Sequence, residues 1–302
     1  MVELWIPITI VAAFLQNLRS ALQKHIKGRL STGGATYVRF FYAWPFAVLY
    51  LWSLHEFGGY AIPEINGTFL LYCLFGGLAQ ILFTFVLIYL FSLRNFAVGT
   101  TYSKTEVVQI ALLGLIFLGD TISLAAVFAI VVGLGGILAL SVAQTEVTWR
   151  NLATSLFEKP TMIGLLCGAL LGASVVFYRG ASLSLGDDPV LMRAAFALAV
   201  SVVIQTVVMG AYLLVREPGQ MTAVVKYWRP SLAIGITGVL CSIGWFTAFT
   251  LQNAAYVRAV GQIELVFTFI ASVFFFKEKT NRLEYLGVAL IVASILLLIL
   301  FR

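Results

Sequence analysis

Ten long apolar stretches follow one another along this sequence, and they leave the chain only one environment in which to fold. A helix needs about 20 mostly apolar residues to cross a bilayer. Charged residues make up 11% of the 302 residues, against roughly 25% in an average soluble domain. The sequence therefore predicts an all-α polytopic membrane protein with ten transmembrane helices, and it excludes a soluble enzyme, a disordered tail and a nucleic-acid-binding module. The expected spans are residues 4–23, 35–54, 68–92, 98–118, 122–142, 161–183, 190–215, 231–251, 256–276 and 284–301.

Lysine and arginine are distributed unevenly over the loops between these spans. The odd-numbered loops, counted from the N-terminus, hold 12 of the 19 basic residues, whereas the even loops and the C-terminus hold only Arg258 and Arg302. Cytoplasmic loops are enriched in Lys and Arg, so we expect the odd loops in the cytoplasm. The prediction is a multi-pass protein of the cytoplasmic (inner) membrane whose N- and C-termini are outside, in the periplasm.

The two halves of the chain resemble each other when the sequence is shifted by 158 residues. Residues 93–141 then align without a gap on residues 251–299, and Glu106 falls on Glu264. Acidic residues are scarce inside the apolar stretches, so this match carries more weight than matches between apolar residues.

Each half holds five spans, and because five is an odd number the second copy must enter the membrane in the opposite sense. We therefore predict two inverted five-helix repeats, residues 4–142 and 161–301, joined by a cytoplasmic linker at 143–160. Inverted repeats are a recurrent plan of secondary transporters, in which the substrate binds between the two copies.

Two segments at equivalent positions of the halves carry a family resemblance. TEVVQIALLGLIFLGDTIS begins at Thr105, and IELVFTFIASVFFFKEKTN begins at Ile263. Both resemble the fourth-helix signature of the drug/metabolite transporter superfamily, EamA type, although Val107 and Leu265 replace the proline that follows the glutamate in that signature. The resemblance covers nearly the whole chain as two EamA-like units. It implies a ten-helix basket with a central cavity lined by the first, third, fourth, sixth, eighth and ninth spans.

Two glutamates, Glu106 and Glu264, lie at membrane depth, where ionisable groups are costly and are functional candidates by default. They could oppose the charge of a substrate amine. They could also couple transport to protons, because a carboxyl group in a low-dielectric cavity binds protons more tightly than in water. A static ion pair with Lys104, or with an arginine of a neighbouring helix, is the structural alternative. Glu264 is the preferred coupling candidate over Glu106, since no basic residue follows it in its span until Lys277.

Four arginines lie near the ends of spans. Arg19 and Arg179 are about one turn inside the first and sixth spans. Their guanidinium groups could hold a carboxylate or phosphate by forked hydrogen bonds, or could snorkel to lipid headgroups. Arg39 and Arg193 begin their spans close to an interface, where a structural role is favoured.

Aromatic and polar residues complete the predicted site. Tyr178 and Trp245 could form an aromatic wall against an organic substrate, although ordinary packing would explain them too. Gln109 shares a helix face with Glu106, and Thr268 shares one with Glu264. The predicted substrate-binding residues are Gln16, Arg19, Tyr178, Arg179, Trp245, Glu106, Gln109, Glu264 and Thr268.

These features favour a secondary active transporter that moves a small organic metabolite, zwitterionic or anionic, by alternating access, as an exporter or exchanger. The alternative is a lipid translocator or scramblase that recognises a charged headgroup. The sequence holds no HExxH motif, no Cys-rich metal site and no GxxxxGK[ST] loop, so it predicts neither an enzyme nor ATP-driven transport, and no cofactor or metal. The expected partners are a small-molecule substrate and membrane lipids. A role for protons and the oligomeric state stay open.

Overall fold

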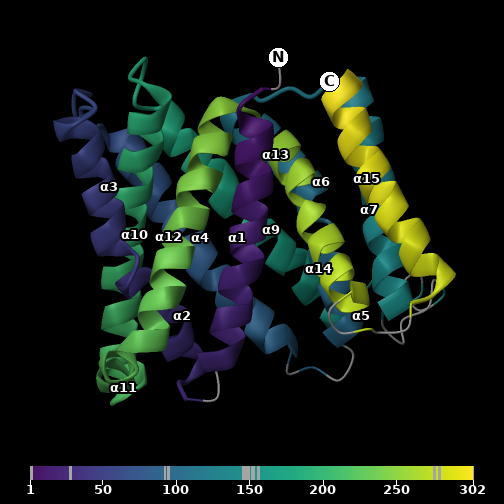
Figure 1. Cartoon of the computed structure of the whole chain (residues 1–302), viewed down its shortest axis with the longest axis horizontal. Coiled ribbons are helices and arrows are strands. Elements are labelled where there is room, and N and C mark those ends of the chain that lie inside the picture. The colour runs from purple at the N-terminus through teal and green to yellow at the C-terminus, as the bar shows by residue number, and fades with distance from the viewer. Residues whose placement is uncertain are drawn as a thin grey trace. The chain divides into compact units, whose positions relative to one another are not determined.

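The computed structural model describes residues 3–26, 29–91, 93, 96–144, 150, 154, 157–274, 277 and 280–301, and within these ranges the chain forms helices and turns without strands. Most of the predicted linker at 143–160 lies outside the described residues. Figure 1 shows the helices. They are α1 Trp5–Ile26, α2 Thr32–Phe41, α3 Trp44–Glu56, α4 Gly67–Phe91, α5 Phe96–Ser103, α6 Glu106–Leu118, α7 Leu124–Gln144, α9 Lys159–Leu183, α10 Val190–Arg216, α11 Gln220–Lys226, α12 Trp228–Leu251, α13 Ala254–Gly261, α14 Ile263–Phe274 and α15 Arg282–Phe301.

Eight helical segments in the described part of the chain are long and apolar enough to cross a membrane. The polytopic all-helical fold is therefore confirmed, while the number of ten spans stays a prediction. The second and ninth predicted spans are absent from the eight because each is divided into two shorter helices, α2 with α3 and α13 with α14. The fourth predicted span is also divided, into α5 and α6.

Each interruption has a local cause or a local hydrogen bond. Pro45 lies in the first turn of α3, and a proline lacks the N–H that a continuous helix would need there. At the end of α5 the hydroxyl of Thr105 donates to the carbonyl of Tyr102 at 2.7 Å, a side-chain bond that competes with helix continuation. In the ninth span, Gly261 ends α13, and glycine is a poor helix former.

The bounds of the helices repeat with the offset of 158 residues found in the sequence. α5 begins at Phe96 and ends at Ser103, and α13 begins at Ala254 and ends at Gly261, so both bounds are displaced by that offset. α7 begins at Leu124 and α15 at Arg282, which are displaced by the same amount. The interruption of the fourth span and that of the ninth therefore fall at equivalent positions.

The chain forms two compact units, and neither coincides with one predicted repeat. Unit 1 comprises Met1–Ile81 with Phe177–Gln252, and unit 2 comprises Leu82–Val176 with Asn253–Arg302. The divisions fall within α4 and within α9. Each unit thus takes helices from both halves of the sequence.

In unit 1, α1 packs along α12 in the opposite direction, and small residues permit the close approach. A methyl group at Gly244 would be 2.8 Å from Cβ of Ala12. Towards the other end of the α1–α12 pair, a methyl group at Gly238 would be 3.6 Å from Cδ of Arg19. α10 packs against α2, α3 and α12. Unit 1 therefore surrounds α12 with helices from both ends of the chain.

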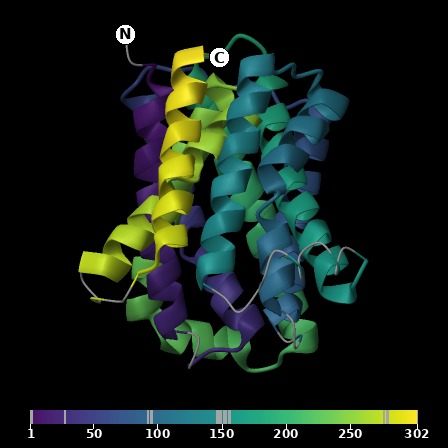
Figure 2. The ribbon, with the colours of Figure 1, turned by 90° about the vertical axis from the view of Figure 1, so that its right-hand side faces the viewer.

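In unit 2, α7 and α15 lie side by side and run in opposite directions (Figures 1 and 2). Gly136 and Gly287 mark the crossing, because a methyl group at either would come within 2.9 Å of the other helix's backbone. Large apolar side chains point outward from both helices, including Phe128 at 60% and Leu300 at 70% exposure. Such apolar exterior faces suit lipid contact rather than water.

Candidate functional sites

A buried ion pair joins the two halves of the sequence inside unit 2. Glu106 is the first residue of α6, and Arg258 projects from α13. The guanidinium Nη2 of Arg258 donates to Oε1 of Glu106, and both side chains are buried. Glu106 also begins a helix, where the partial positive charge of the helix dipole favours a carboxylate. An ion pair with an arginine of a neighbouring helix was the structural alternative predicted from the sequence for Glu106. The structure contains such a pair.

The placement of Arg258 in an external loop was wrong. The residue lies in α13 and is 6% exposed. Arg258 was counted with the loop although it stands two residues inside the predicted span 256–276. α13 begins still earlier, at Ala254, where Asn253 caps the helix by accepting a hydrogen bond from the N–H of Ala255. With Arg258 removed, the even loops hold still fewer basic residues, so the asymmetry behind the predicted orientation becomes larger.

A second, looser ion pair involves the other membrane glutamate. Nζ of Lys104, in the turn between α5 and α6, lies 3.8 Å from Oε1 of Glu264 in the first turn of α14. The Lys104 side chain is 36% exposed, whereas that of Glu264 is 11% exposed. Here too the cation comes from one half of the sequence and the acid from the other. A flexible lysine that reaches the surface can leave its partner more readily than a buried arginine can.

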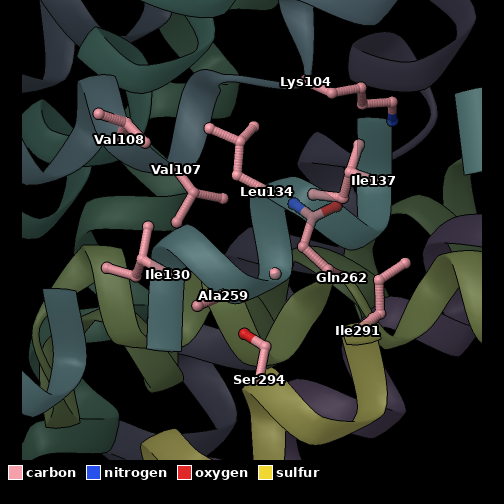
Figure 3. Close-up of a pocket in the computed structure, with 11 residues that line it drawn as sticks. Lys104, Val107, Val108, Ile130, Leu134, Ile137, Ala259, Gln262, Ile291 and Ser294 are labelled. Atoms are coloured by element: carbon pink, nitrogen blue, oxygen red, sulfur yellow. The ribbon is translucent and has the colours of Figure 1, made fainter. Parts of the chain in front are cut away.

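A small cavity adjoins this second pair (Figure 3). Apolar side chains of α6, α7 and α15 line it together with Lys104, Gln262 and Ser294. Its open core measures about 10 Å³, which is room for about one water molecule. The amide of Gln262 points into the space beside Leu134 and Ile137 (Figure 3).

Neither polar atom of that Gln262 amide has a hydrogen-bond partner among the described residues, although the residue is only 4% exposed. Buried polar groups are normally paired, so a water molecule in the cavity is the expected partner. Gln262 stands 158 residues after Lys104, at the equivalent position of the second predicted repeat. The two interruptions therefore carry a cation in one half and a neutral amide in the other.

The two polar residues predicted to share faces with the glutamates bond to their own helices. Nε2 of Gln109 donates to the Thr105 hydroxyl at 3.0 Å. The Thr268 hydroxyl donates to the backbone carbonyl of Glu264 at 2.9 Å, not to its carboxylate. Both residues stay candidates for substrate contact, and both belong to unit 2.

Unit 1 brings together a different group of predicted residues. Arg19 on α1 is 8% exposed, and its Nε has no hydrogen-bond partner among the described residues. A methyl group at Gly238 would lie 3.6 Å from Cδ of Arg19 and 4.0 Å from Cγ of Arg39. Both arginine stems therefore face the same point on α12, and their guanidinium groups repel each other electrostatically.

Tyr178 of α9 lies within electrostatic range of Arg39 and belongs to a hydrogen-bonded network. Its hydroxyl donates to Oε1 of Gln80 at 3.3 Å and accepts from Nε2 of Gln205 at 3.0 Å. Nε2 of Gln205 also donates to Oε1 of Gln80 at 2.8 Å. The Tyr178 ring contacts Phe246 with centroids 4.7 Å apart. Three helices, α4, α9 and α10, thus hold this tyrosine in one orientation.

The remaining predicted residues of unit 1 have structural contacts. Nη1 of Arg179 donates to the carbonyls of Phe249 and Gln252, each at 2.6 Å, and a cation there complements the C-terminal end of α12. The Trp245 ring stacks on Phe249 with centroids 5.5 Å apart. Gln16 lies half-buried on α1, one turn before Arg19. A binding role for each of them stays a prediction.

Sequence reasoning missed three residues of these clusters. Arg258 was assigned to a loop, and Gln80 and Gln205 were not singled out. The signal for the glutamines was present, because a lone polar side chain in the middle of a long apolar helix must find a partner. Which partner each would find depends on tertiary packing. The described residues also contain no group of three or more His, Cys, Asp or Glu side chains that could hold a metal ion.

Comparison with known proteins adds family information. Residues 159–300 match the model of the EamA-like transporter family. A protein of Sinorhizobium sp. described as an uncharacterized transporter in the cobO 3′ region is 28% identical over 140 residues, which are 45% of this chain and 94% of that protein. A solved structure titled only as the crystal structure of a protein has a TM-score of 0.69 at 16% identity, covering 98% of this chain and 96% of its own. At that identity the likeness concerns the fold alone.

Apolar helices that can span a bilayer, together with these similarities, make the chain a multi-pass membrane transporter. Residues 159–300 are similar to the EamA-like transporter family, and the resemblance predicted from the sequence is confirmed. Members of this family are transporters rather than enzymes.

Proposed function

We propose that the protein is a secondary active transporter that moves a small organic metabolite, zwitterionic or anionic, across the cytoplasmic membrane by alternating access. Ten spans in two inverted repeats would give it two states of similar energy, one open to each side. The observation that carries the proposal is the pair of interrupted helices in unit 2. They break at equivalent positions and bear an ionised pair at each break. Interrupted helices at membrane depth are where secondary transporters bind substrates and coupling ions.

The pairing between halves gives these interruptions a mechanical meaning. Glu106 of the first repeat is held by Arg258 of the second, and Glu264 of the second is held by Lys104 of the first. A movement of one repeat against the other would strain both ion pairs, because each pair joins the two repeats. The buried pair would resist it, while the exposed lysine could follow or release its partner. Glu264 is therefore the proposed coupling residue.

Hydrogen bonds near the helix ends support ten crossings. Four of them join two predicted loop regions within one unit, and in each case both regions have the same parity, so that both are expected on the same side of the membrane. An eight-span chain, in which the second and ninth spans failed to cross, would place some of these partners on opposite sides. The four bonds join Ser31 with Glu217, Asn66 with Ser184, Asn253 with Thr121, and Asn281 with Ala143.

The decisive experiment is transport by the purified full chain in proteoliposomes. A panel of radiolabelled amino acids, nucleotide-like metabolites and organic anions is offered with and without a pH gradient, and we expect accumulation of at least one member. Parallel vesicles carry a fluorescent phospholipid whose transfer between leaflets is measured. Lipid transfer without uptake of any metabolite would favour the lipid translocator instead, and neither activity would contradict both functions.

Orientation is tested separately by labelling in intact cells with a membrane-impermeant thiol reagent. Arg29→Cys, in the first loop, should stay unlabelled, and Asp187→Cys, in the sixth, should react. The native cysteines are buried and give a low background. Labelling at position 29 but not at position 187 would reverse the proposed orientation, with the termini then in the cytoplasm.

A further inference from the structure

The interior of unit 1 is positively charged and contains no acid to balance it. Its acidic residues are Glu3, Glu56, Glu64, Asp187, Asp188 and Glu217, and all of them lie at helix ends or between helices. Arg19 and Arg39 lie within α1 and α2 and form no ion pair with any described residue. Charged groups at such depth are expensive, and natural ones are nearly always paired. Two neighbouring cations without an acid are therefore an incomplete arrangement.

The immediate surroundings of the pair leave no protein group to complete it. The Tyr178 hydroxyl, which lies within electrostatic range of Arg39, already donates to Gln80 and accepts from Gln205. On α12, Gly238 faces both arginine stems and has no side chain to offer them. Nε of Arg19 is buried without a partner among the described residues. What the geometry lacks is an acceptor with negative charge.

We infer that Arg19 and Arg39 together form an anion-binding subsite of unit 1, and that the transported substrate carries a carboxylate or phosphate group that binds there. A guanidinium offers planar, forked donors that match either group. Tyr178, fixed by its two glutamine partners, closes one side and offers its ring to the remainder of the substrate. This inference rests on the proposed transport function and deepens it, because it makes the substrate anionic at this end and assigns Arg39, expected to be structural, to binding.

The equivalent arginine of the second repeat shows the contrast. Nη1 of Arg193 donates to the carbonyl of Gly186 at 2.8 Å, so its charge serves the turn between α9 and α10. Arg39 has no such carbonyl partner among the described residues. Arg193→Met is therefore the matched control for Arg39→Met, because it removes a guanidinium from the same unit at the corresponding place in the other repeat.

The experiment follows thermal unfolding of the purified full chain in an uncharged detergent. Inorganic phosphate or succinate is titrated against chloride at constant ionic strength. We expect a saturable rise of the wild-type midpoint. Arg19→Met and Arg39→Met should each raise the half-saturating concentration roughly tenfold or more, since each loses a charge-assisted hydrogen bond. The Arg19→Met/Arg39→Met double variant should show no saturable rise, and Arg193→Met should keep the wild-type half-saturating concentration.

A rise that persists in the double variant would be a general salt effect and would overturn the subsite, as would single variants that titrate like the wild type. A second arm replaces the soluble anions with phosphatidylglycerol and uses phosphatidylcholine as its control. If only phosphatidylglycerol acts, and acts through both arginines, the bound anion is a lipid headgroup.

The two proposals fail in different ways. Anion binding through both arginines without movement of any labelled metabolite would leave the subsite standing and remove the transport function. Metabolite transport that is unchanged by both substitutions would do the reverse.

Discussion

The two units of this transporter treat charge inside the membrane in opposite ways. Among its described residues, unit 2 contains the ion pairs Arg258–Glu106 and Lys104–Glu264. In unit 1, Arg19 and Arg39 lie within helices, whereas the acidic residues of the unit lie at helix ends or between helices. One unit is therefore neutral inside by its own residues, and the other needs an anion from elsewhere. Under the two proposals, unit 2 would hold the halves of the sequence together and respond to protons, whereas unit 1 would recognise the substrate.

A second difference lies within unit 2. One ion pair is buried on both sides, and the other has a lysine that is 36% exposed. A buried ion pair contributes little net stability, but removing one of its partners is strongly destabilising. A partly exposed ion pair contributes little to the free energy of unfolding, and removing one of its partners changes that free energy little. The first is suited to hold a fixed contact between the repeats, and the second to change during a transport cycle.

The largest predicted effect tests the buried pair. Glu106→Gln leaves the guanidinium of Arg258 without its counter-charge and should lower the free energy of unfolding by about 3–5 kcal/mol. Chemical unfolding in detergent, with size-exclusion chromatography to check for aggregation, measures it. Glu106→Leu combined with Arg258→Leu removes both charges and should recover most of the loss. If Glu106→Gln lowers the free energy of unfolding by no more than the double leucine variant does, Glu106 and Arg258 do not form a buried ion pair.

An effect of opposite sign is expected in unit 1. Arg19→Met removes a buried cation that has no acid partner, so the protein free of added anions should gain about 1–3 kcal/mol of stability. Arg193→Met, which loses a hydrogen bond to Gly186, should instead lose about 1 kcal/mol. The same unfolding measurement in chloride buffer decides both. A loss of stability in Arg19→Met would mean that an unrecognised partner within the protein already balances this arginine.

The fold was largely predictable because it depends on local signals. Apolar length alone placed the long helices, and the bounds of α1, α9 and α10 agree with the predicted spans to within a few residues. The interruptions were harder to foresee. Pro45 was a visible signal for the break between α2 and α3. The break at Thr105 falls in the polar run TTYSKTE at 100–106, which the prediction enclosed in one span, and a side-chain hydrogen bond of Thr105 marks it.

The candidate sites were predictable as residues but not as pairs. Glu106, Glu264 and Arg19 stand out in the sequence because charge is rare in apolar helices. Their partners depend on how distant helices pack. Arg258 was not recognised as a partner, and it was assigned to a loop because it lies only a few residues inside its helix. For Arg39, the position near the start of a predicted span favoured a structural role, and its proximity to Arg19 and Gly238 depends on packing that the sequence does not show.

The smallest effect on stability is expected at the loose pair, and it should be accompanied by a change in function. Glu264→Gln keeps the shape of the side chain and removes its charge. Because Lys104 is partly exposed and can turn to solvent, the free energy of unfolding should change by no more than about 1 kcal/mol.

Transport by Glu264→Gln in proteoliposomes should nevertheless lose its dependence on the pH gradient, while anion binding at Arg19 and Arg39 survives, because those residues belong to the other unit. The matched comparison is Lys104→Met, which leaves the carboxylate in place and should retain a pH dependence, shifted but present. Full pH-dependent uptake by Glu264→Gln would remove this residue from coupling. Loss of pH dependence in both variants would show that the ion pair as a whole, rather than protonation of the glutamate, is what the transport cycle requires.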